Sequence, residues 1–437
     1  MNVLMMTSAA PKMAVFSTDE KRPPLGVGFL ISVMKTAGHQ VYFVDNYLNP
    51  SNVLETDFLI KRQIDFVGIY SNTICYQGTL LLLHKLQYLR EKRKWNGKII
   101  VGGPHTSVGS NSIPEFVDHV VVGEGEVSIL EIISGTETDR IVYGKKVTDM
   151  DNLPLPAWEE FVYLPYMWRD PWIDTFPVYT FNTSRGCSFD CNFCSVQSVW
   201  GKAYRFMSAE RVVSDIEYMI KYYGLKGAYF REDHFTLSKA RVVDFCELLL
   251  RKNIRIEWIC ETRVDNLCDL EYLKLISKAG CRAFYIGVES GSPRMLEFFK
   301  KGETVEQFVD AFGLAKKVGI KTYASFVVGA PTETGEDRKA THDLISILKP
   351  DYYSTNIYAG IPGSELYEYV RKNRLYEYED LNKVLYLKGH NKRVNKYYHG
   401  NPYFKIPSTV RKKQIVIFEM KKKIGLILKQ IKNKIQY

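Results

Sequence analysis

The sequence predicts an α/β protein made of a doubly wound, Rossmann-like domain, a partial (βα)6 barrel of the TIM type and a short helical C-terminal extension. Two observations support this prediction: short β-branched runs alternate with longer helical patterns, and a proline-containing stretch divides the alternation into two series. We place the first domain at residues 1–147, a linker at 148–176, the barrel at 177–375 and the extension at 376–437. A chain of 437 residues with 46% hydrophobic and 25% charged residues has the composition of a folded globular protein, which excludes disordered and collagen-like classes.

The first series predicts a parallel sheet with helices on both faces. Its five strands are expected at residues 3–7, 41–45, 66–70, 98–102 and 119–123. Helical patterns lie between most of them, near residues 28–36, 79–92 and 127–133. Ligands bind such sheets at the carboxyl ends of the strands. Two of these ends carry glycine-rich loops, at residues 102–106 and 123–126.

The linker contains Pro154, Pro156 and Pro165 among polar and aromatic residues, a composition typical of a connection between domains. Four tryptophans flank the linker and the start of the second series: Trp158, Trp168, Trp172 and Trp200. We expect them to seal the interface between the domains. The alternative is that they line a pocket for a flat or apolar substrate.

The second series contains six βα units. Its strands are expected at residues 178–184, 227–231, 255–261, 283–288, 321–328 and 352–358. Its expected helices include those at residues 209–223, 240–252, 270–279, 305–318 and 338–348. Six units indicate an open relative of the eight-fold barrel, in which the chemistry takes place at the carboxyl ends of the strands.

The net charge of +10 is concentrated near the C-terminus. Residues 405–437 hold ten lysines and arginines against one acid, Glu419, so residues 1–404 hold 49 basic and 48 acidic side chains. A neutral body does not indicate a nucleic-acid partner. Apolar residues within 417–435 recur at three- and four-residue steps, which predicts an amphipathic helix. We expect this helix to pack on the barrel, the alternative being peripheral contact with an anionic membrane.

Neither a membrane span nor a secretory signal is evident. No window approaches the ~18 uninterrupted apolar residues that a span requires, and residues 1–12 lack a basic stretch before an apolar core. We therefore expect a cytoplasmic protein, or one bound peripherally to a membrane through its C-terminal helix.

Three of the eight cysteines, Cys187, Cys191 and Cys194, follow the first predicted barrel strand with the spacing C-x3-C-x2-C. Three thiolates on one tight loop can bind three irons of a cubane cluster and leave the fourth iron open to an exogenous ligand. Zinc is the alternative, but a closed zinc site needs four ligands, and the nearest candidate, His234, is forty residues away. The other cysteines (Cys75, Cys246, Cys260, Cys268 and Cys281) are expected to be small buried hydrophobic residues, so a single cluster is expected.

This cysteine loop, with Phe193 before its last cysteine and its place after the first strand of a βα series, resembles the radical S-adenosylmethionine (SAM) superfamily. The resemblance implies that Cys187, Cys191 and Cys194 bind a [4Fe–4S] cluster whose open iron takes the amino and carboxylate groups of SAM. It also implies that an external electron donor, such as flavodoxin or ferredoxin, reduces the cluster, and that SAM is then cleaved to a 5′-deoxyadenosyl radical.

The resemblance also assigns residues to SAM. Glu289, flanked by Gly287 and Ser290 at the end of a strand, resembles the acidic residue that binds the ribose. Arg263 ends another strand and could face the SAM carboxylate, or it could form an ion pair at the barrel rim. Ser325 and Ala359 lie on the last two strands of the series and are assigned to SAM- or substrate-facing edges.

A doubly wound domain before such a barrel, joined by a linker of the type found at residues 151–158, is similar to the cobalamin-binding subfamily of radical SAM enzymes. The resemblance covers residues 1–375. The residues it assigns to cobalamin are Thr73, Gly102, Gly103, His105, Gly123, Glu124, Gly125 and Glu126. Ordinary turn chemistry is the alternative for the glycines. The Asp-x-His-x-x-Gly signature of other cobalamin proteins is absent, so we expect no axial histidine from it, and His105 is the remaining candidate ligand.

The resemblance implies a C-methyltransferase that uses the radical and methylcobalamin to methylate an unactivated carbon. Its substrate would be a small molecule, namely a natural-product, lipid or pigment precursor. One alternative is a cyclase, oxidoreductase or rearrangement enzyme of the same architecture without methyl transfer. A more distant alternative is an iron–sulfur protein for electron transfer or sensing. We expect a monomer or a weak dimer.

Overall fold

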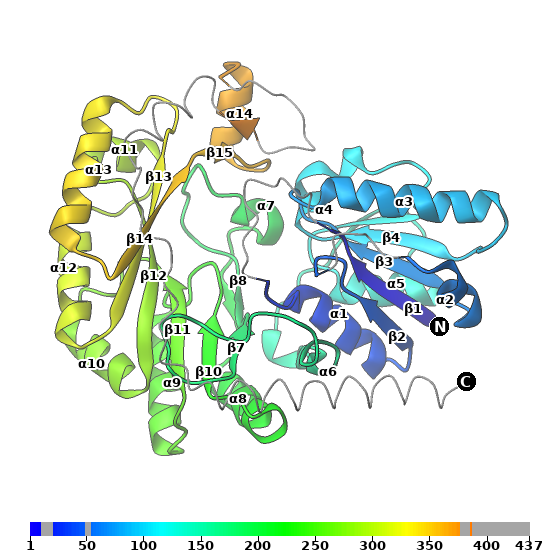
Figure 1. Cartoon of the computed structure of the whole chain (residues 1–437), viewed down its shortest axis with the longest axis horizontal. Helices are drawn as coiled ribbons and strands as arrows, with labels where there is room; N and C mark the ends of the chain where they lie inside the picture. Colours follow the sequence, from blue (N-terminus) through cyan, green and yellow to red (C-terminus); the bar gives the residue numbers. More distant parts are fainter. Residues whose placement is uncertain (10–20, 49–53, 376–384, 387–437) are drawn as a thin grey trace.

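The computed structural model describes residues 1–9, 21–48, 54–375 and the two-residue strand Leu385–Tyr386. Its two large sheets are parallel, and the two halves of the molecule lie beside each other with helix α7 (Val196–Trp200) between them (Figure 1). The α/β fold class predicted from the alternation of strands and helices is confirmed.

The first sheet has the strand order β2-β1-β3-β4-β5-β6. The elements of this half are β1 (Asn2–Thr7), α1 (Leu25–Thr36), β2 (Gln40–Val44), α2 (Thr56–Lys61), β3 (Phe66–Tyr70), α3 (Tyr76–Glu91), β4 (Lys98–Gly102), α4 (Pro104–Gly109), β5 (His119–Val122), α5 (Glu126–Ser134) and β6 (Ile141–Tyr143). The chain runs outward from β1 to β2 and then returns to place β3 on the other side of β1. This reversal creates a switch point at the carboxyl ends of β1 and β3, where doubly wound sheets bind ligands.

The five predicted strands of this sheet occur within one residue of their predicted bounds, whereas α2, α4 and β6 were not predicted. Strand β6 has three residues and α2 has six, and such short elements do not show the apolar period of a strand or of a helix. Helix α4 begins with Pro104 and ends with Gly109, and these residues indicate a loop. A proline at the first helical position is nevertheless compatible with a helix, because the N–H it lacks has no partner there.

The second sheet has the order β14-β13-β12-β11-β10-β7, so each strand pairs with the next along the chain, as in an open barrel. Its strands are β7 (Val178–Phe181), β10 (Gly227–Phe230), β11 (Glu257–Thr262), β12 (Cys281–Glu289), β13 (Lys321–Val328) and β14 (Tyr352–Ile357). The helices around it are α6 (Trp158–Phe161), α8 (Ala209–Tyr223), α9 (Lys239–Arg251), α10 (Leu270–Lys278), α11 (Pro293–Phe298), α12 (Val305–Lys317), α13 (Gly335–Leu348) and α14 (Glu365–Lys372). Two small antiparallel pairs, β8 (Ser184–Arg185) with β9 (Arg205–Phe206) and β15 (Ala359–Gly360) with β16 (Leu385–Tyr386), lie outside the two large sheets.

The first strand predicted for the barrel, residues 178–184, is divided in the structure. Strand β7 ends at Phe181, and Ser184 belongs to β8, which leaves the main sheet to pair with β9. The side-chain amide of Asn182, between the two strands, donates to the carbonyl of Arg231 at 2.8 Å. The chain therefore turns out of the barrel just before the cysteine loop.

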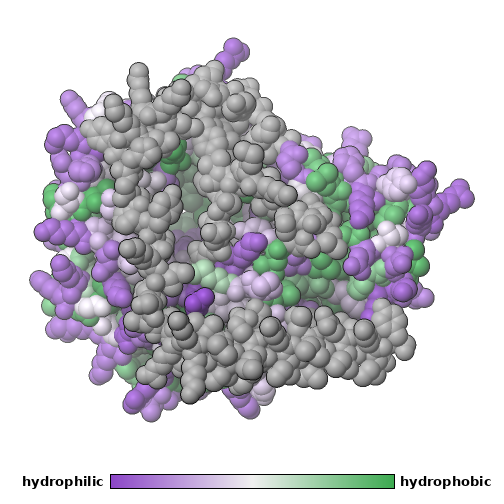
Figure 2. Space-filling view, viewed as in Figure 1, coloured by the Kyte–Doolittle hydropathy of each residue, from purple (hydrophilic) through white to green (hydrophobic). Residues whose placement is uncertain are grey.

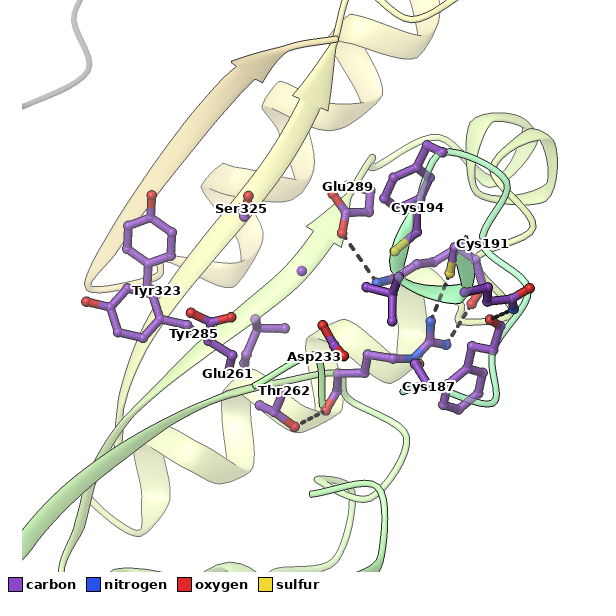
Figure 3. A pocket seen from close by; sticks show the side chains of 18 residues that line it. Cys187, Cys191, Cys194, Asp233, Glu261, Thr262, Tyr285, Glu289, Tyr323 and Ser325 are labelled. Atoms are coloured by element: carbon purple, nitrogen blue, oxygen red, sulfur yellow. Dashed lines mark hydrogen bonds and ion pairs between the residues drawn. The ribbon is translucent and has the colours of Figure 1, made fainter. Parts of the chain in front are cut away.

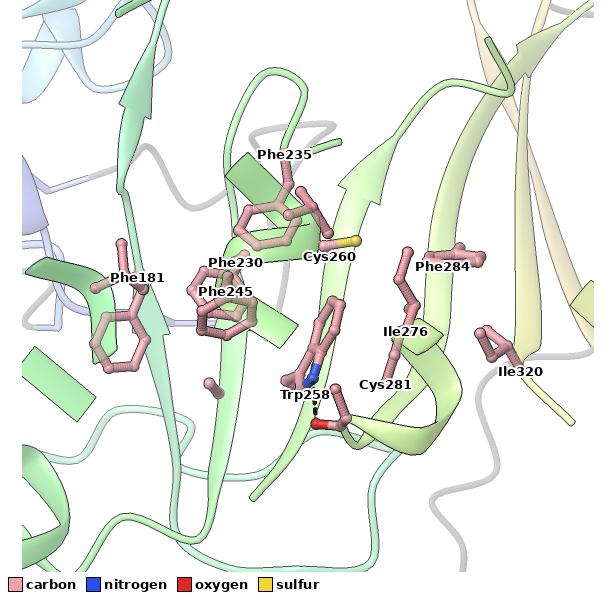
Figure 4. Packing of buried hydrophobic residues seen from close by; sticks show 14 of the residues in the cluster. Phe181, Phe230, Phe235, Phe245, Trp258, Cys260, Ile276, Cys281, Phe284 and Ile320 are labelled. Atoms are coloured by element: carbon pink, nitrogen blue, oxygen red, sulfur yellow. Dashed lines mark hydrogen bonds between the residues drawn. The ribbon is translucent and has the colours of Figure 1, made fainter. Parts of the chain in front are cut away.

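Side chains from the sheet and the outer helices form the core of the barrel (Figure 4). Phe230, Phe235 and Phe245 surround Trp258, whose ring nitrogen donates to the carbonyl of Ala279 at 3.0 Å. Four of the five isolated cysteines are buried, as predicted: Cys75, Cys246, Cys260 and Cys281. Cys268 is exposed, contrary to the prediction, because it lies in the turn that precedes α10.

The predicted linker is packed against both sheets. Trp158 is 1% exposed, and its ring contacts Tyr179 of β7 edge-on. The hydroxyl of Ser32 on α1 donates to the carbonyl of Leu155 at 2.6 Å. Trp168 and Trp172 are also buried, so three of the four tryptophans are interior, while Trp200 is half-buried at the end of α7.

The predicted amphipathic helix within 417–435 lies outside the described residues. Among the described helices, none combines the length and the apolar character that a membrane crossing requires. The described outer surface on the barrel side is mostly hydrophilic in the view of Figure 2, with scattered hydrophobic residues.

Candidate active site

The three clustered cysteines line a cavity of about 350 Å³ at the carboxyl ends of the barrel strands. We call it the cysteine cavity. Its lining residues are Cys187, Phe189, Cys191, Phe193, Cys194, Val196, Gln197, Asp233, Glu261, Thr262, Arg263, Tyr285, Ile286, Gly287, Glu289, Lys301, Tyr323 and Ser325. Figure 3 shows the cysteines at one end of the cavity and the two tyrosines at the other.

The cysteine loop is shaped by its backbone. Gly186, which precedes Cys187, has φ +86°, and a Cβ there would lie 2.4 Å from the carbonyl oxygen of Ala203. Within the loop, the amide of Cys194 donates to the carbonyl of Cys191 at 3.1 Å. The backbone and side chain of Asn192 donate to the carbonyls of Phe299 and Phe298 at 3.1 and 2.6 Å. These contacts hold the loop over the segment that follows α11.

The three thiols are unbridged and fit a cluster better than a single metal ion. Among the described residues, no three His, Cys, Asp or Glu side chains converge closely enough to enclose one ion. In a cubane cluster each cysteine binds a different iron, so its thiolates need not converge on one point. Burial raises the pKa of Cys194 to about 11 and that of Cys191 above its usual value, while Lys301 and Arg263 oppose the shift at Cys191.

Arg263 lies beside the cysteine loop, and its donors are engaged by the protein. One terminal nitrogen donates to Cys191 Sγ at 3.3 Å, and the other donates to the carbonyl of Lys301 at 2.6 Å. Its Nε donates to Asp265 at 2.7 Å, and its guanidinium carbon lies 3.7 Å from the centre of the Phe189 ring. The structure thus places Arg263 in the cavity and also forms the ion pair that was the alternative prediction.

Glu289, at the end of β12, faces the cavity with an unusual backbone. Its φ is +67°, a left-handed conformation that a residue other than glycine rarely adopts, and the register between β12 and β13 shifts between Gly287 and Glu289. A Cβ on Gly287 would lie 2.5 Å from Glu289 Oε1, so the glycine leaves room for the carboxylate. Residues in strained conformations concentrate at functional sites.

Lys301 supports this carboxylate and was not predicted from the sequence. It is 3% exposed, and its Nζ lies 3.4 Å from Glu289 Oε1 and 3.2 Å from Glu303 Oε2. Asp233 also lines the cavity, and desolvation by the surrounding protein raises its pKa to about 6. A lysine points to a functional site only when it is known to be buried, and burial is known only from the structure. No sequence pattern distinguishes Lys301 from the neighbouring Lys300, which is exposed.

The far end of the cysteine cavity is aromatic and acidic. Tyr285 and Tyr323 lie 4.9 Å apart between ring centres, and Trp172 from the linker packs edge-on against both. Glu261 accepts a hydrogen bond from the Tyr229 hydroxyl at 2.7 Å. Trp172 thus closes the inner end of this site.

The other residues assigned to SAM differ in their placement. Ser325 and Phe193 line the cysteine cavity, and the Phe193 ring packs edge-on against Phe299. Ser290 is buried behind the cavity wall next to Thr341, and Ala359 is not among the lining residues. Both follow strands that end at the cavity, but their side chains do not reach it.

A second cavity of about 270 Å³ lies at the switch point of the first sheet. Its lining residues are Thr7, Ser8, Arg22, Pro24, Asp45, Tyr47, Tyr70, Asn72, Cys75 and Arg231. Most of these follow β1, β2 and β3, whereas Arg231 follows β10 of the barrel. Asp45 accepts hydrogen bonds from Thr7 and from Tyr166 of the linker. The second cavity therefore lies between the two halves of the molecule.

The residues assigned to cobalamin lie at the same sheet edge but do not line the second cavity. His105 is 1% exposed and stacks on Tyr76, with Nδ1 3.3 Å from Thr73 Oγ1 and Nε2 3.0 Å from Ser112 Oγ. Burial lowers the pKa of His105 to about 4. Because both ring nitrogens have partners within the domain, His105 does not present a free nitrogen to a ligand.

The glycine-rich loops also lie outside the lining of the second cavity. Gly102 and Gly103 form the turn from β4 into α4, and Gly123 and Gly125 form the turn from β5 into α5. The carboxylates of Glu124 and Glu126 form buried ion pairs with Arg185 and Arg205 of the barrel instead of lining the second cavity. Sequence reasoning could not find these partners, because they lie 59 to 81 residues away along the chain.

Two family profiles match the two halves of the chain. Residues 181–345 match the radical SAM superfamily, and residues 11–133 match the B12 binding domain. The first matched region contains the cysteine loop, and the second contains strands β2 to β5 of the first sheet. The sequence therefore supports a cluster and SAM at the cysteine cavity and cobalamin at the first domain.

Relatives extend over most of the chain. An uncharacterized methyltransferase of Pyrococcus horikoshii is 30% identical over 397 residues, which cover 85% of this chain and 83% of the relative. An anaerobic magnesium-protoporphyrin IX monomethyl ester cyclase of Rubrivivax gelatinosus is 29% identical over 385 residues, covering 79% of this chain and 66% of the relative. The chain thus spans slightly less than two thirds of the cyclase.

A solved structure shares the fold. The cobalamin-dependent SAM radical enzyme OxsB, with aqua-cobalamin and SAM bound, superimposes with a TM-score of 0.72 at 19% sequence identity. The match covers 88% of this chain and 64% of OxsB. The shared fold agrees with the two profile matches and with the similarity to the Pyrococcus relative. The chain belongs to the cobalamin-dependent radical SAM enzymes, and its relatives in this family include methyltransferases and cyclases.

Proposed function

We propose that this chain transfers a methyl group from SAM, by way of cobalamin, to an unactivated carbon of a small molecule. The observation that supports this proposal is the arrangement of the two cavities. Glu261 lines the cysteine cavity, Arg231 lines the second cavity, and Arg231 Nε lies 3.7 Å from Glu261 Oε1. A substrate near this partly exposed pair would lie between a radical source and a methyl carrier.

The cofactors of the family are a [4Fe–4S] cluster, SAM and cobalamin. When bound, the cluster and SAM supply a carbon radical that removes a hydrogen atom, and cobalamin supplies the methyl group. In our proposal Cys187, Cys191 and Cys194 hold the cluster. Arg263 donates to Cys191 and fixes the orientation of that ligand, as outer contacts of metal sites do.

We assign the ribose of SAM to Glu289. A carboxylate accepts hydrogen bonds from two vicinal hydroxyls, and Gly287 leaves space in front of it. Lys301 holds the carboxylate in place. Ser325 lies on the neighbouring strand and contributes a further hydroxyl to the same cavity.

The aromatic residues at the far end of the cysteine cavity limit where a substrate can lie. Tyr285, Tyr323 and Trp172 close the inner end of the barrel, which keeps water from a radical formed there. For cobalamin we assign the second cavity, whose polar lining includes Asp45, held in place by the hydroxyl of Tyr166 from the linker. We propose no cobalt ligand from His105, since its nitrogens contact Thr73 and Ser112.

Anaerobic reconstitution tests this proposal. The full chain is loaded with iron, sulfide and hydroxocobalamin, then reduced by a flavodoxin or a chemical donor and supplied with SAM carrying a deuterated methyl group. We expect both 5′-deoxyadenosine and S-adenosylhomocysteine, with the labelled methyl group in a small molecule from an extract of the source cells. Formation of deoxyadenosine without S-adenosylhomocysteine would contradict methyl transfer and would still be consistent with radical chemistry.

A second candidate is a cyclase or oxidoreductase, favoured by the magnesium-protoporphyrin ester cyclase relative. Such an enzyme would consume SAM by radical cleavage without incorporating its methyl group. The deuterated methyl label therefore distinguishes the two candidates: it appears in the product of a methyltransferase and is absent from the product of a cyclase.

A further inference from the structure

The cysteine loop leaves and re-enters the barrel through a narrow neck. Strands β8 and β9 pair antiparallel, with Arg185 directly opposite Arg205. Residues 186–204 lie between these two arginines and include all three clustered cysteines and helix α7. Whatever holds the two arginines together therefore holds both ends of the cysteine loop.

One carboxylate of the first domain contacts both arginines. Glu124 Oε2 lies 2.7 Å from a terminal nitrogen of Arg185 and 3.0 Å from one of Arg205. Glu124 Oε1 accepts from the other terminal nitrogen of Arg205. The side chain of Glu124 is 1% exposed, and Oε2 also accepts from the amide of Val147 at 3.1 Å.

Arg185 has further partners on both sides of the interface. Glu126 accepts from its second terminal nitrogen. Its guanidinium lies 5.0 Å from the ring centre of Trp200, at the end of α7, and 5.7 Å from that of Phe29 on α1. Its side chain is 6% exposed. The neck is thus a buried group of two arginines and two glutamates, balanced in charge, with the acids in one domain and the arginines in the other.

A buried ion pair that loses one member leaves an uncompensated charge, which is strongly destabilising. The neck can avoid that state only by opening to water, and opening would separate the ends of the cysteine loop. We propose that Glu124 is a positioning residue for the iron–sulfur cluster: it closes the neck of the cysteine loop, so that the first domain takes part in holding a cluster bound by the second. The proposal rests on the cluster site assigned under the proposed function.

The test compares Glu124→Gln with Glu131→Gln in the full chain. Glu131 is on α5, 30% exposed, and pairs with the exposed Lys145, so it is the matched control. Both proteins are reconstituted with iron and sulfide alone, without SAM, cobalamin or substrate. Iron release to a chelator is followed by absorbance, and hydrogen–deuterium exchange is measured for residues 186–204 and for both sheets.

We expect Glu124→Gln to release iron about tenfold faster or more than wild type, with faster exchange in residues 186–204 and unchanged exchange in β3, β4, β12 and β13. Glu131→Gln should match wild type in both measurements. Iron release by Glu124→Gln at the wild-type rate would overturn the proposal. Hydrogen–deuterium exchange raised equally in both sheets would also overturn it, because that result indicates a general loss of stability.

A milder variant covers the case in which Glu124→Gln does not fold. Glu126 contacts Arg185 and leaves Arg205 paired with Glu124, so Glu126→Gln should raise iron release and exchange in residues 186–204 by a smaller factor. No change in either quantity would overturn the proposal. If wild type itself bound no cluster, the assigned cluster site would be wrong, whereas exchange in residues 186–204 would still report on the neck.

Discussion

The two cavities of this protein are built in different ways. The three clustered cysteines of the cysteine cavity come from one loop of eight residues, and strands β11, β12 and β13 each contribute two or more further lining residues. The second cavity is assembled from the ends of three strands of one domain and Arg231 of the other. A site made by one loop is visible in the sequence, whereas a site made by converging strand ends is visible only after folding.

Charged groups show the same difference. Around the cysteine cavity, Arg263 and Lys301 contact residues of their own domain. Around the second cavity, Asp45 is held by Tyr166 of the linker, and Arg231 enters from the barrel. We therefore expect changes at the cysteine cavity to act on SAM chemistry, and changes at the second cavity to act mainly on stability and cobalamin binding.

The largest expected effect is that of Cys191→Ala, because a cluster loop with two thiolates cannot hold its cluster. Deoxyadenosine formation from SAM by the reconstituted protein should fall to the level of a control without protein. Cys268→Ala is the matched control, since Cys268 is exposed and outside both cavities. Undiminished cleavage by the Cys191 variant would contradict the assignment of the cluster.

His105 tests the first domain through its pH dependence. Burial lowers its pKa to about 4, below the ~6.5 of an unfolded chain, so the folded state binds fewer protons between these values. The free energy of unfolding should therefore fall as the pH drops from about 6.5 to about 4, by up to about 3 kcal/mol from this group.

His105→Gln should remove that part of the acid sensitivity, which urea titrations at pH 7 and pH 4.5 would measure. His84→Gln, at an exposed position on α3, is the control and should keep the full difference between the two pH values. An unchanged difference in the His105 variant would show that His105 is not held neutral in the fold.

Glu289→Gln should weaken SAM binding by roughly 10- to 100-fold, because a hydrogen bond to a charged group contributes about that factor to affinity. Equilibrium dialysis of the cluster-loaded protein against SAM measures it. Glu297→Gln is the control, because Glu297 is exposed on α11. Equal affinity of the two variants would move the ribose site elsewhere in the cysteine cavity.

The smallest expected effect concerns the pair between the cavities. The side chains of Arg231 and Glu261 are 48% and 37% exposed, and exposed pairs contribute less than about 1 kcal/mol to stability. Arg231→Gln should therefore unfold in urea within about 1 kcal/mol of wild type. Arg282→Gln, which removes a partly exposed pair with Glu257, offers a comparison. A much larger loss for Arg231 would mean that it supports the domain interface.

Much of the fold could be predicted from the sequence. The five predicted strands of the first sheet lie within one residue of their predicted bounds, because buried parallel strands and amphipathic helices leave local periods in the chain. The division of residues 178–184 into β7 and β8 could not be predicted, since the exit from the sheet is fixed by pairing with β9. Local apolar character does not record which strand a segment pairs with.

The sequence by itself determined the two α/β units, the cysteine loop and the family to which they belong. Only the tertiary structure decided that Glu124 and Glu126 bind the barrel's arginines, that both nitrogens of His105 have partners, and that Lys301 supports Glu289. The physical reason is the range of the interactions. Periodicity and ligand spacing are properties of neighbouring residues, whereas a buried charge takes whichever partner the packing of distant segments places beside it.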